Sequence, residues 1–480
     1  MPQYLVAVRQ GQASLGVARR MASSTSAVAH PPLARRMEQF GTETVWQEFT
    51  PLSAEVGAIN CGQGFPDWAS PAFVKDALRQ ATMEDNANQY CRSAGLPALT
   101  QALAKRYSAF LGRPVNWATE VTIGVGASET LFASMQALVD HGDEVLLISP
   151  AFDIYSSQVV MAGGVPKYVP LRLVDAAEEG GAAAGVAVAA TRRRQVWKLD
   201  MAEFAAAFSE RTRVVVLNTP HNPTGKCFDA EELAQIAAIV QRHPRVVVVS
   251  DEVYEHMVYG GRKHLRIATL PGMWERTLTV SSAGKTFSVT GWKIGWAVGP
   301  EALVKGLVLT NQWVQYSVST PCQHAVALCL DLADKPYEGF PSYYAWLNAE
   351  YVRKRDILTA GLVAAGLTPV APEGGFFIIA DTSNVAVPEA YMRVTTKAAP
   401  VMTRDWAFCR YLTLEHKVTA IPPSAFFEGE DKAIARNIAR FAFCKEDASL
   451  AEACRRLRGL REAAVDKSLL PALPVEASSS

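Results

Sequence analysis

A lysine that could act as a nucleophile follows a short apolar run. Lys285 lies within residues 281–287, a segment of mostly small side chains directly after the apolar run 277–280. An apolar strand that ends in small residues would place this amine at the mouth of a sheet, with little neighbouring bulk. An amine shielded from water loses its proton near neutral pH and can attack a carbonyl to form an imine. Because most lysines are solvated surface charges, Lys285 alone does not decide the chemistry.

Parts of this chain resemble three motifs of other protein classes, but each match is incomplete. The G-K-T sequence at 284–286 resembles the end of a P-loop, but the first glycine of that pattern would fall at Thr279. The S-A-G-K sequence at 282–285 fits the S-x-x-K of penicillin-binding enzymes, but no S-D-N or K-T-G partner follows it. The segment 124–129 begins like a dinucleotide fingerprint, but Glu129 replaces the third glycine. These departures argue against an NAD- or nucleotide-binding protein.

Short β-rich runs alternate with helical patterns from residue 121 to about residue 296. The runs predicted as strands are residues 121–125, 144–149, 214–217, 246–250 and 278–280, and apolar residues at helical spacing occur over 127–139 and 229–241. This alternation predicts a parallel sheet with covering helices.

Residues with chemical capability follow the predicted strands, at the sheet edge where ligands of an open α/β fold bind. A helix opening at Ala127 and Ser128 would offer free N–H groups and a helix dipole to a phosphate. Phe152 supplies an aromatic ring, and Asn222 lies between proline-containing turns that hold its amide rigidly. Asp251 follows a mostly apolar run, where a carboxylate is costly without a cationic partner.

Each of these residues also has an ordinary explanation. Asn222 is explained as a turn residue, Phe152 as a core residue, and Asp251 as a helix cap or ion pair. Five strands that deliver such groups to one edge are harder to explain by chance. Together with the phenol of Tyr254 they describe a site for pyridoxal phosphate, in which Lys285 holds the aldehyde as an imine and Asp251 keeps the ring nitrogen protonated.

Composition excludes several other functions. The chain has 480 residues, is 49% hydrophobic and carries a formal net charge of +0, so it can bury a large core and has no basic footprint for nucleic acid. No uncharged stretch is long enough to span a bilayer. The 8 cysteines and 8 histidines are dispersed without metal-ligand spacing. We therefore predict no metal, no nucleic-acid partner and no membrane partner.

The pattern changes along the chain and predicts a division into parts. Residues 1–37 form a leader, 38–66 an N-terminal arm that is part of the small domain, 67–334 a large cofactor-binding domain, 335–468 a small C-terminal domain, and 469–480 a disordered tail. Within the large domain, the low-complexity residues 174–194 are interpreted as an exposed insertion loop. In the small domain, long helical stretches at 343–365, 407–416 and 450–463 enclose strand-like pieces at 375–380 and 438–443.

The leader has the composition of a targeting segment. Five arginines and several serines precede the first acidic residue, Glu38. An arginine- and serine-rich segment without acidic residues is typical of a transit peptide, which would direct the protein to a mitochondrion or chloroplast. The alternative is a disordered tail on a cytoplasmic protein, with initiation also at Met21.

Four motifs occur in a fixed order and carry a family resemblance. They are N-T-P-H-N-P-T-G at 218–225, D-E-V-Y at 251–254, S-A-G-K at 282–285 and G-W-K-I-G-W at 291–296. This set resembles fold-type I, class I/II aminotransferases, which implies an α/β fold with a mostly parallel, seven-stranded-type sheet sandwiched by helices, and a homodimer with shared active sites. The stretches 62–67, 270–276 and 283–295 resemble the kynurenine aminotransferase branch, also called glutamine transaminase K or cysteine-S-conjugate β-lyase. The similarity runs from roughly residue 46 to residue 461.

The resemblance implies a role for each matching residue. Lys285 would be the imine lysine and proton shuttle, Asp251 the partner of the pyridinium, and Asn222 and Tyr254 the hydrogen-bond partners of the ring oxygen. Phe152 would stack on the ring. The phosphate would be held by Ala127, Ser128, Ser282 and Lys293, where Lys293 replaces the arginine of the wider class by a point charge. Arg440 matches the arginine that pairs with the substrate carboxylate, although a surface salt bridge is the ordinary explanation of any single arginine.

Residues at the rim would set the substrate range. Trp46, Gly64, Tyr90 and Tyr316 match positions that line the side-chain pocket, and Tyr316 is expected from the partner subunit. An aromatic pocket without a second substrate arginine favours kynurenine, glutamine, phenylalanine and methionine over dicarboxylates. The chain departs from mammalian members at Ser128, where they have tyrosine, and at Tyr316, where they have phenylalanine.

These observations predict a transaminase that moves the amino group of kynurenine or another neutral or aromatic amino acid to a 2-oxo acid. Elimination from cysteine conjugates is a predicted side reaction. One alternative is a transaminase that prefers methionine or aromatic amino acids. Another is a catalytically silent protein of the same fold, which would be expected to lack Lys285, Asp251 or Arg440; all three are present.

Overall fold

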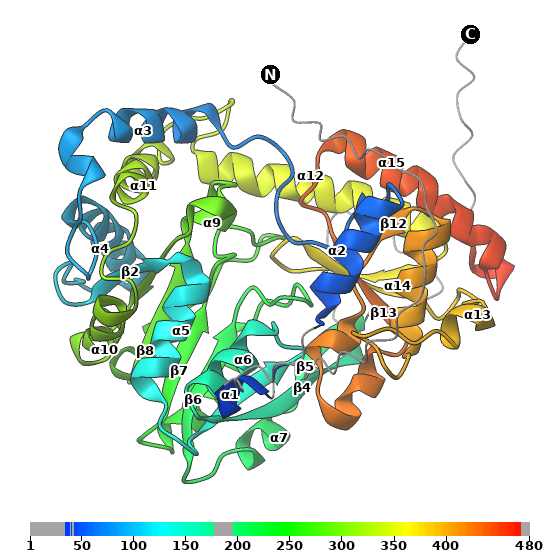
Figure 1. Cartoon of the computed structure of the whole chain (residues 1–480), viewed down its shortest axis with the longest axis horizontal. Helices are drawn as coiled ribbons and strands as arrows, with labels where there is room; N and C mark the ends of the chain where they lie inside the picture. Colours follow the sequence, from blue (N-terminus) through cyan, green and yellow to red (C-terminus); the bar gives the residue numbers. More distant parts are fainter. Residues whose placement is uncertain (1–33, 39, 41–42, 177–194, 472–480) are drawn as a thin grey trace, which may run out of the picture.

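The structure of the protein is a computed structural model that describes residues 34–38, 40, 43–176 and 195–471. Its centre is an eight-stranded sheet (Figure 1). In spatial order the strands are β2 (Val121–Val125), β9 (Ile294–Val298), β8 (Thr277–Ser282), β7 (Val247–Asp251), β6 (Thr212–Asn218), β3 (Glu144–Ser149), β4 (Val165–Asp175) and β5 (Gln195–Leu199). Strands β9 and β5 run antiparallel to their neighbours, and the remaining strands are parallel. The predicted α/β fold class is confirmed.

The sheet has one strand more than the seven expected. Strand β4 continues to Asp175 and pairs antiparallel with β5, from Leu171 opposite Leu199 to Asp175 opposite Gln195. The extra strand buries Trp197 and Leu199 against the sheet, which gives this edge its apolar support. The predicted insertion loop therefore begins later than expected, since Val174 and Asp175 belong to β4; residues 177–194 lie outside the described part of the chain.

Alternating residues of the strands pack into two hydrophobic layers, one on each face of the sheet. In β7, Val247 and Val249 pack in a cluster with α5 (Gly126–Leu138), α6 (Ile154–Met161) and α10 (Glu301–Val314), whereas Val248 packs in a cluster with α7 (Met201–Ala206) and α8 (Ala230–Gln241). The period of two along each strand thus places helices on both faces of the sheet. This arrangement leaves the carboxyl ends of the parallel strands free to form a site.

A second, smaller group of elements lies beside the large sheet (Figure 1). Its sheet has the order β10 (Thr368–Val370), β11 (Phe377–Asp381) and β13 (Ile438–Ala442), flanked by α12 (Tyr343–Ala364), α14 (Arg404–Glu415) and α15 (Asp447–Leu457). The N-terminal helix α2 (Val45–Glu55) packs here, where the ring of Phe49 lies 5.7 Å from that of Trp406. Strand β1 (Ile59–Asn60) then pairs with β12 (Val418–Thr419). The N-terminal arm is therefore held by the C-terminal elements, while the predicted boundaries at 66, 334 and 468 stay predictions.

The remaining helices complete the frame. They are α1 (Arg35–Glu38), α3 (Ala72–Thr82), α4 (Pro97–Leu111), α9 (Ala283–Thr286), α11 (Thr320–Leu332) and α13 (Glu389–Met392). The helix predicted at 450–463 changes to 3-10 geometry over Arg458–Ala463, where Gly459 lies so close to His416 that an added Cβ would be 2.8 Å from its ring. Among the described residues, no helix combines the length and apolarity needed to cross a bilayer. Residues 1–33 of the predicted leader and 472–480 of the predicted tail lie outside the described part.

Candidate active site

A cavity of about 400 Å³ lies where the carboxyl ends of β6, β7 and β8 meet the small group of elements. The predicted site residues that line it are Trp46, Gly64, Ala127, Ser128, Phe152, Asn222, Asp251, Tyr254, Ser282, Lys285, Lys293 and Arg440. They come from the N-terminal helix α2, from strands of the large sheet and the loops and helices beside them, and from β13 of the small sheet. The structure therefore brings together twelve of the fourteen predicted residues.

Two predicted residues, Tyr90 and Tyr316, do not line this cavity within the chain. Their side chains lie together on the surface, with ring centroids 5.4 Å apart, and they are 83% and 55% exposed. Tyr316 was expected to act in the site of a second subunit, so its surface position fits that expectation. Tyr90 was expected to line the side-chain pocket; within one chain it lies on the surface beside Tyr316, and its place in the pocket stays a prediction.

Lys285 reaches the cavity from α9, which begins directly after β8. Its neighbour Gly284 fits only without a side chain, because a Cβ there would lie 3.0 Å from the Cα of Thr290. The Nζ of Lys285 donates to the carbonyl oxygen of Gly64 at 2.8 Å. Burial, assisted by the positive charges of Arg440 and Lys293, lowers the pKa of Lys285 to about 8. About one tenth of the amine is therefore in its neutral, nucleophilic form at pH 7, far more than for an ordinary lysine.

Asp251 ends β7, and its backbone pairs with Asn218 of β6 and Val280 of β8. Its Oδ2 accepts a hydrogen bond of 2.6 Å from the hydroxyl of Tyr155, on α6. Burial raises the pKa of Asp251 to about 6, while the Tyr155 hydrogen bond and the charge of Lys285 oppose this rise. Its Oδ1 accepts from the N–H of Val253 at 3.3 Å, in a turn rather than at a helix start. Within the described residues no basic side chain forms an ion pair with Asp251, so neither a helix cap nor an ion pair within the chain explains its burial. The carboxylate is available to a cationic group in the cavity.

Tyr155 was not predicted as a site residue from the sequence. It follows Phe152 by three residues, so both lie on the same side of the helix start, with ring centroids 5.9 Å apart. That spacing after a predicted strand was the available signal. Asn218 was also not predicted as a site residue. Its Nδ2 donates to the carbonyl oxygen of Asp251 at 2.9 Å, and its Oδ1 accepts from the N–H of Asn222 at 2.7 Å. Asn218 thereby fixes Asn222 relative to Asp251.

Arg440 is a buried cation without a carboxylate partner among the described residues. Its side chain is 1% exposed, and its two terminal nitrogens donate to Oδ1 of Asn222 at 3.0 Å and to the carbonyl oxygen of Gly62 at 2.7 Å. Its Nε has no hydrogen-bond partner. Burial lowers the pKa of Arg440 to about 10, yet the group stays protonated at neutral pH. A buried guanidinium that faces a cavity in this state is prepared to bind an anion.

Aromatic side chains surround this guanidinium. Its carbon lies 4.2 Å from the ring centre of Phe377, 5.0 Å from that of Phe426 and 5.3 Å from that of Trp46. The indole N–H of Trp46 donates to Oδ2 of Asp153 at 2.8 Å, which fixes the N-terminal helix α2 over the cavity. The surface salt bridge considered for Arg440 from the sequence is therefore wrong, because the residue is enclosed by aromatic rings.

The start of α5 forms a second anion-binding surface. Gly126 has φ 73°, and a Cβ on Gly295 of β9 would lie 2.4 Å from the N atom of Ala127. This close approach leaves the first N–H groups of a 13-residue helix at the cavity, where they lack partners within the helix. Lys293, in the left-handed region with φ 55°, lines the same part of the cavity with Ser128 and Ser282. Helix dipole and ammonium together favour a dianion such as a phosphate.

Comparison with known proteins agrees with this geometry. Residues 57–457 match the family model described as aminotransferase class I and II. The chain belongs to this family. It is 44% identical over 431 residues to the kynurenine–oxoglutarate transaminase of Dictyostelium discoideum, with 89% of this chain and 96% of that protein covered. The predicted family and the prediction of an enzyme are thereby confirmed.

Solved structures of the family superpose over most of the chain. Bna3p of Saccharomyces cerevisiae aligns with a TM-score of 0.81 at 32% identity, with 90% of this chain and 100% of that chain covered. YbdL of Escherichia coli, identified as a methionine aminotransferase, aligns with a TM-score of 0.76 at 32% identity over 90% of this chain and 100% of its own. The fold of the aminotransferase therefore extends through both groups of elements.

Proposed function

We propose that this aminotransferase uses pyridoxal 5′-phosphate to transfer the amino group of kynurenine or another neutral or aromatic amino acid to a 2-oxo acid. The observation that carries the proposal is Arg440, a buried guanidinium without an acidic partner that lines the same cavity as the Lys285 amine. A primary amine beside an unpaired carboxylate-binding group is what a 2-amino acid and its 2-oxo product both require.

The residues of the cavity fit pyridoxal phosphate. The open helix start at Ala127 with Lys293 suits the phosphate, the unpaired carboxylate of Asp251 suits a protonated ring nitrogen, and the face of Phe152 suits the ring. When bound, the cofactor would supply an electron sink for the electrons released at the substrate α-carbon. These residues would hold and orient it. In the described part of the chain, no group of three or more His, Cys, Asp or Glu side chains could hold a metal ion.

The protein's own groups have distinct tasks in this proposal. Lys285 would accept a proton from the substrate α-carbon and return it to the cofactor side, for which a pKa of about 8 is well matched. Tyr254 and Asn222 would hydrogen-bond the ring oxygen, and Asn222 would also hold Arg440 in place. Arg440 would bind the α-carboxylate of both amino donor and oxo acid. The catalytically silent alternative is disfavoured because Lys285, Asp251 and Arg440 converge on one cavity.

The lining of the cavity supports neutral and aromatic side chains. Lys285, Lys293 and Arg440 are its basic residues, and each already has a task, so no cation remains for a second carboxylate. Trp46, Phe65 and Phe377 add apolar walls. The names of the relatives point to kynurenine and methionine as donors. A β-elimination from cysteine conjugates would use the same proton abstraction by Lys285, with the β-substituent leaving in place of amino transfer.

A homodimer with shared sites is part of the proposal. Tyr90, Trp313 and Tyr316 are exposed by 83%, 81% and 55%, which is unusual for large aromatic side chains and supports a contact surface there. Tyr316 of the partner subunit would then enter this chain's pocket. We also propose that the leader directs the protein to a mitochondrion or chloroplast, which sequencing the N-terminus of native protein would test; an intact Met1 would contradict it.

Steady-state rates across a panel of amino donors test the proposed function. With one 2-oxo acid acceptor, kynurenine, phenylalanine, methionine and glutamine should each give kcat/KM values at least about 100-fold above that of aspartate. Lys285→Ala should abolish turnover in every case. Absence of turnover with every neutral or aromatic donor would contradict the proposal, and a preference for methionine over kynurenine would favour the alternative donor.

A further inference from the structure

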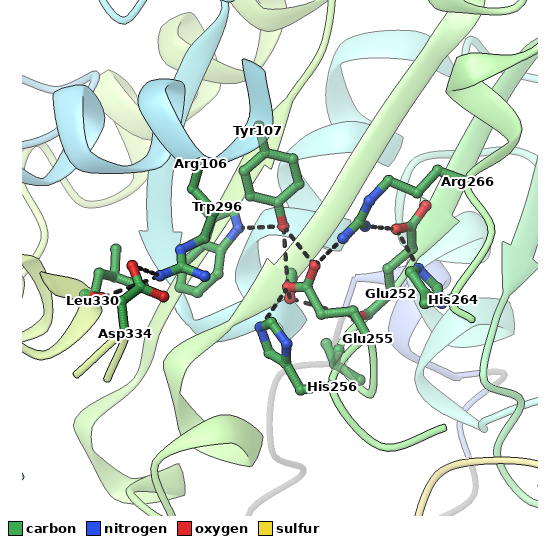
Figure 2. A network of polar contacts seen from close by, with 12 residues as sticks. Arg106, Tyr107, Glu252, Glu255, His256, His264, Arg266, Trp296, Leu330 and Asp334 are labelled. Atoms are coloured by element: carbon green, nitrogen blue, oxygen red, sulfur yellow. Dashed lines mark hydrogen bonds and ion pairs between the residues drawn. The ribbon is translucent and has the colours of Figure 1, made fainter. Parts of the chain in front are cut away.

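Figure 2 shows a network of polar contacts around Glu252, Glu255 and Arg266, which are buried charged residues that the proposed reaction does not use. Glu252 and Glu255 are 0% and 6% exposed and do not line the cavity, although their neighbours Asp251 and Tyr254 do. Arg266 pairs with both carboxylates, one terminal nitrogen contacting Oε2 of Glu252 and the other Oε2 of Glu255. The Arg266 guanidinium thus bridges two acidic residues of the turn 251–255, which also carries the site residues Asp251 and Tyr254.

Each carboxylate has further partners that fix its position. The Oε1 of Glu252 accepts from the Ser250 hydroxyl at 2.8 Å, and its Oε2 lies 2.7 Å from Nε2 of His264. The Oε1 of Glu255 accepts from Ser281 at 2.8 Å and from Tyr107 at 3.1 Å. The Nε2 of His256 lies 4.0 Å from Oε1 of Glu255, and the indole N–H of Trp296 donates to the hydroxyl of Tyr107 at 3.0 Å.

The members of the network are chain neighbours of the site residues. Ser250 and Glu252 flank Asp251, Glu255 follows Tyr254, and Ser281 precedes Ser282. Because side chains alternate along a strand, Ser250 and Asp251 at the end of β7, like Ser281 and Ser282 at the end of β8, point to opposite faces of the sheet. Glu252 and Glu255 lie in the segment that follows β7, which also carries Tyr254. Any movement of the network therefore moves the backbone from which the site residues project.

Arg266 is the group on which this arrangement depends. Burial alone would raise the pKa of Glu255, but Arg266 and the nearby histidines lower it to about 2, so the carboxylate is charged at neutral pH. The guanidinium also packs on aromatic rings, with its carbon 4.6 Å from the ring centre of Phe110 and 5.3 Å from that of Tyr107. Without Arg266, two buried carboxylates three residues apart would repel each other across one turn.

We propose that Arg266 is a positioning residue for amino transfer: by bridging Glu252 and Glu255, it fixes the turn 251–255 and thereby the directions in which Asp251 and Tyr254 enter the cavity. The proposal rests on the proposed function for the roles of these two residues. A purely structural role would change the stability of the whole fold, whereas a positioning role changes the exchange of the turn and kcat selectively.

Arg266→Lys tests this proposal, since lysine keeps the charge but cannot bridge both carboxylates as a fork. The matched control is Arg353→Lys, because Arg353 also bridges two carboxylates, Glu350 at 2.6 Å and Asp447 at 2.8 Å, on the outer surface of α12. The first measurement is hydrogen exchange in the apoprotein at the amides of Glu252 and Glu255, which donate to the carbonyl oxygens of Val280 and Glu252. We expect exchange at these amides to be at least about tenfold faster in Arg266→Lys and unchanged in the control.

The second measurement uses the loaded protein. Arg266→Lys should shift the pH midpoint of the cofactor absorbance band and lower kcat at least about tenfold, with KM for the amino donor changed less than about twofold. An exchange rate or a pH midpoint in Arg266→Lys equal to that of Arg353→Lys would overturn the proposal. If neither the wild type nor the variants bind the cofactor, the proposed function is wrong. The exchange measurement in the apoprotein still tests whether Arg266 fixes the turn.

A second variant keeps the test decisive if Arg266→Lys does not fold. The triple variant Glu252→Gln, Glu255→Gln, Arg266→Met removes the buried charges together and keeps amide groups for the hydroxyl partners. Faster exchange of the turn in this folded variant supports the proposal. Exchange at the wild-type rate would show that the bridge does not position the turn.

Discussion

At the scale of single residues, the site contains two groups whose ionisation is shifted in opposite directions. Burial lowers the pKa of Lys285 to about 8 and raises that of Asp251 to about 6. Lys285 releases its proton more readily than an ordinary lysine, whereas Asp251 holds its proton more tightly than an ordinary aspartate. A cation beside Asp251 would reverse the second shift, which is the effect that a protonated ring nitrogen would have.

Arg440→Gln should raise the pKa of Lys285 in the apoprotein. The positive charge of Arg440 is one of the causes that lower this pKa, so its removal favours the protonated amine and moves the midpoint above about 8. Reductive methylation of Lys285 as a function of pH, followed by mass spectrometry of its peptide, measures the midpoint. Arg353→Gln, far from the cavity on α12, should leave it unchanged; an unchanged or lower midpoint in Arg440→Gln would contradict the expected sign.

Tyr155→Phe tests the support of Asp251. The variant loses the 2.6 Å hydrogen bond to Oδ2, which favours the charged carboxylate, so the pKa of Asp251 should rise further. A hydrogen bond to a charged group contributes about 1.5–3 kcal/mol, and we expect kcat to fall at least about tenfold. Tyr391→Phe, which removes an exposed hydroxyl bound to Glu415, is the control. Equal kcat values in the two variants would show that Tyr155 does not act through Asp251.

At the scale of elements, the anion-binding helix start depends on how closely β9 passes α5. Gly295 has no room for a side chain, because a Cβ would lie 2.3 Å from the carbonyl carbon of Gly126. A helix start that is displaced by even a small distance would no longer direct its N–H groups at a phosphate. Backbone packing between these two elements is therefore part of the binding site.

Gly295→Ala should weaken binding of pyridoxal phosphate at least about tenfold, because the neighbouring contact is backbone and cannot move aside. Gly291→Ala, four residues earlier, meets no atom within 4 Å and should bind the cofactor as the wild type does. Titration of each apoprotein with pyridoxal phosphate, followed by absorbance, gives the two dissociation constants. Similar constants for both variants would contradict the role assigned to this crossing.

Much of the site could be predicted from the sequence because its residues lie in local motifs directly after strands. Lys285 and Asp251 follow apolar runs, and the sheet rule places the ends of such runs together. Tyr155 and Arg266 were not predicted, since their importance comes from contacts made across the fold, to Asp251 and to Glu252 and Glu255. Strands β4, β5 and β9 were not among the predicted strands; for β5, five residues after a low-complexity segment carry too little periodicity.

At the scale of the whole molecule, the proposal requires two chains for one complete pocket. Tyr90 and Tyr316 are together on the surface, outside the cavity of their own chain. Tyr316 also has φ 64°, a left-handed conformation that is uncommon for a large side chain, two residues after the end of α10. A partner subunit that receives Tyr316 would account for this exposure.

Mixing two inactive or weakened chains tests the shared pocket. Lys285→Ala lacks the amine, and Tyr316→Ala should lower kcat/KM for kynurenine at least about tenfold through loss of aromatic contact. In a hybrid dimer, one site would combine the intact Lys285 of the Tyr316→Ala chain with the intact Tyr316 of the Lys285→Ala chain. Mixed and refolded chains should therefore exceed the activity of Tyr316→Ala alone. Activity that only averages the two parents would contradict a shared site.

The central claim is that the amine of Lys285 holds the cofactor, and chemical reduction tests it most directly. Wild-type protein incubated with pyridoxal phosphate, treated with sodium borohydride and digested should yield one modified peptide, with the cofactor fixed on Lys285. Lys293, the other lysine of the cavity, should remain unmodified. Cofactor fixed on Lys293 or on no lysine in the wild type would contradict the account.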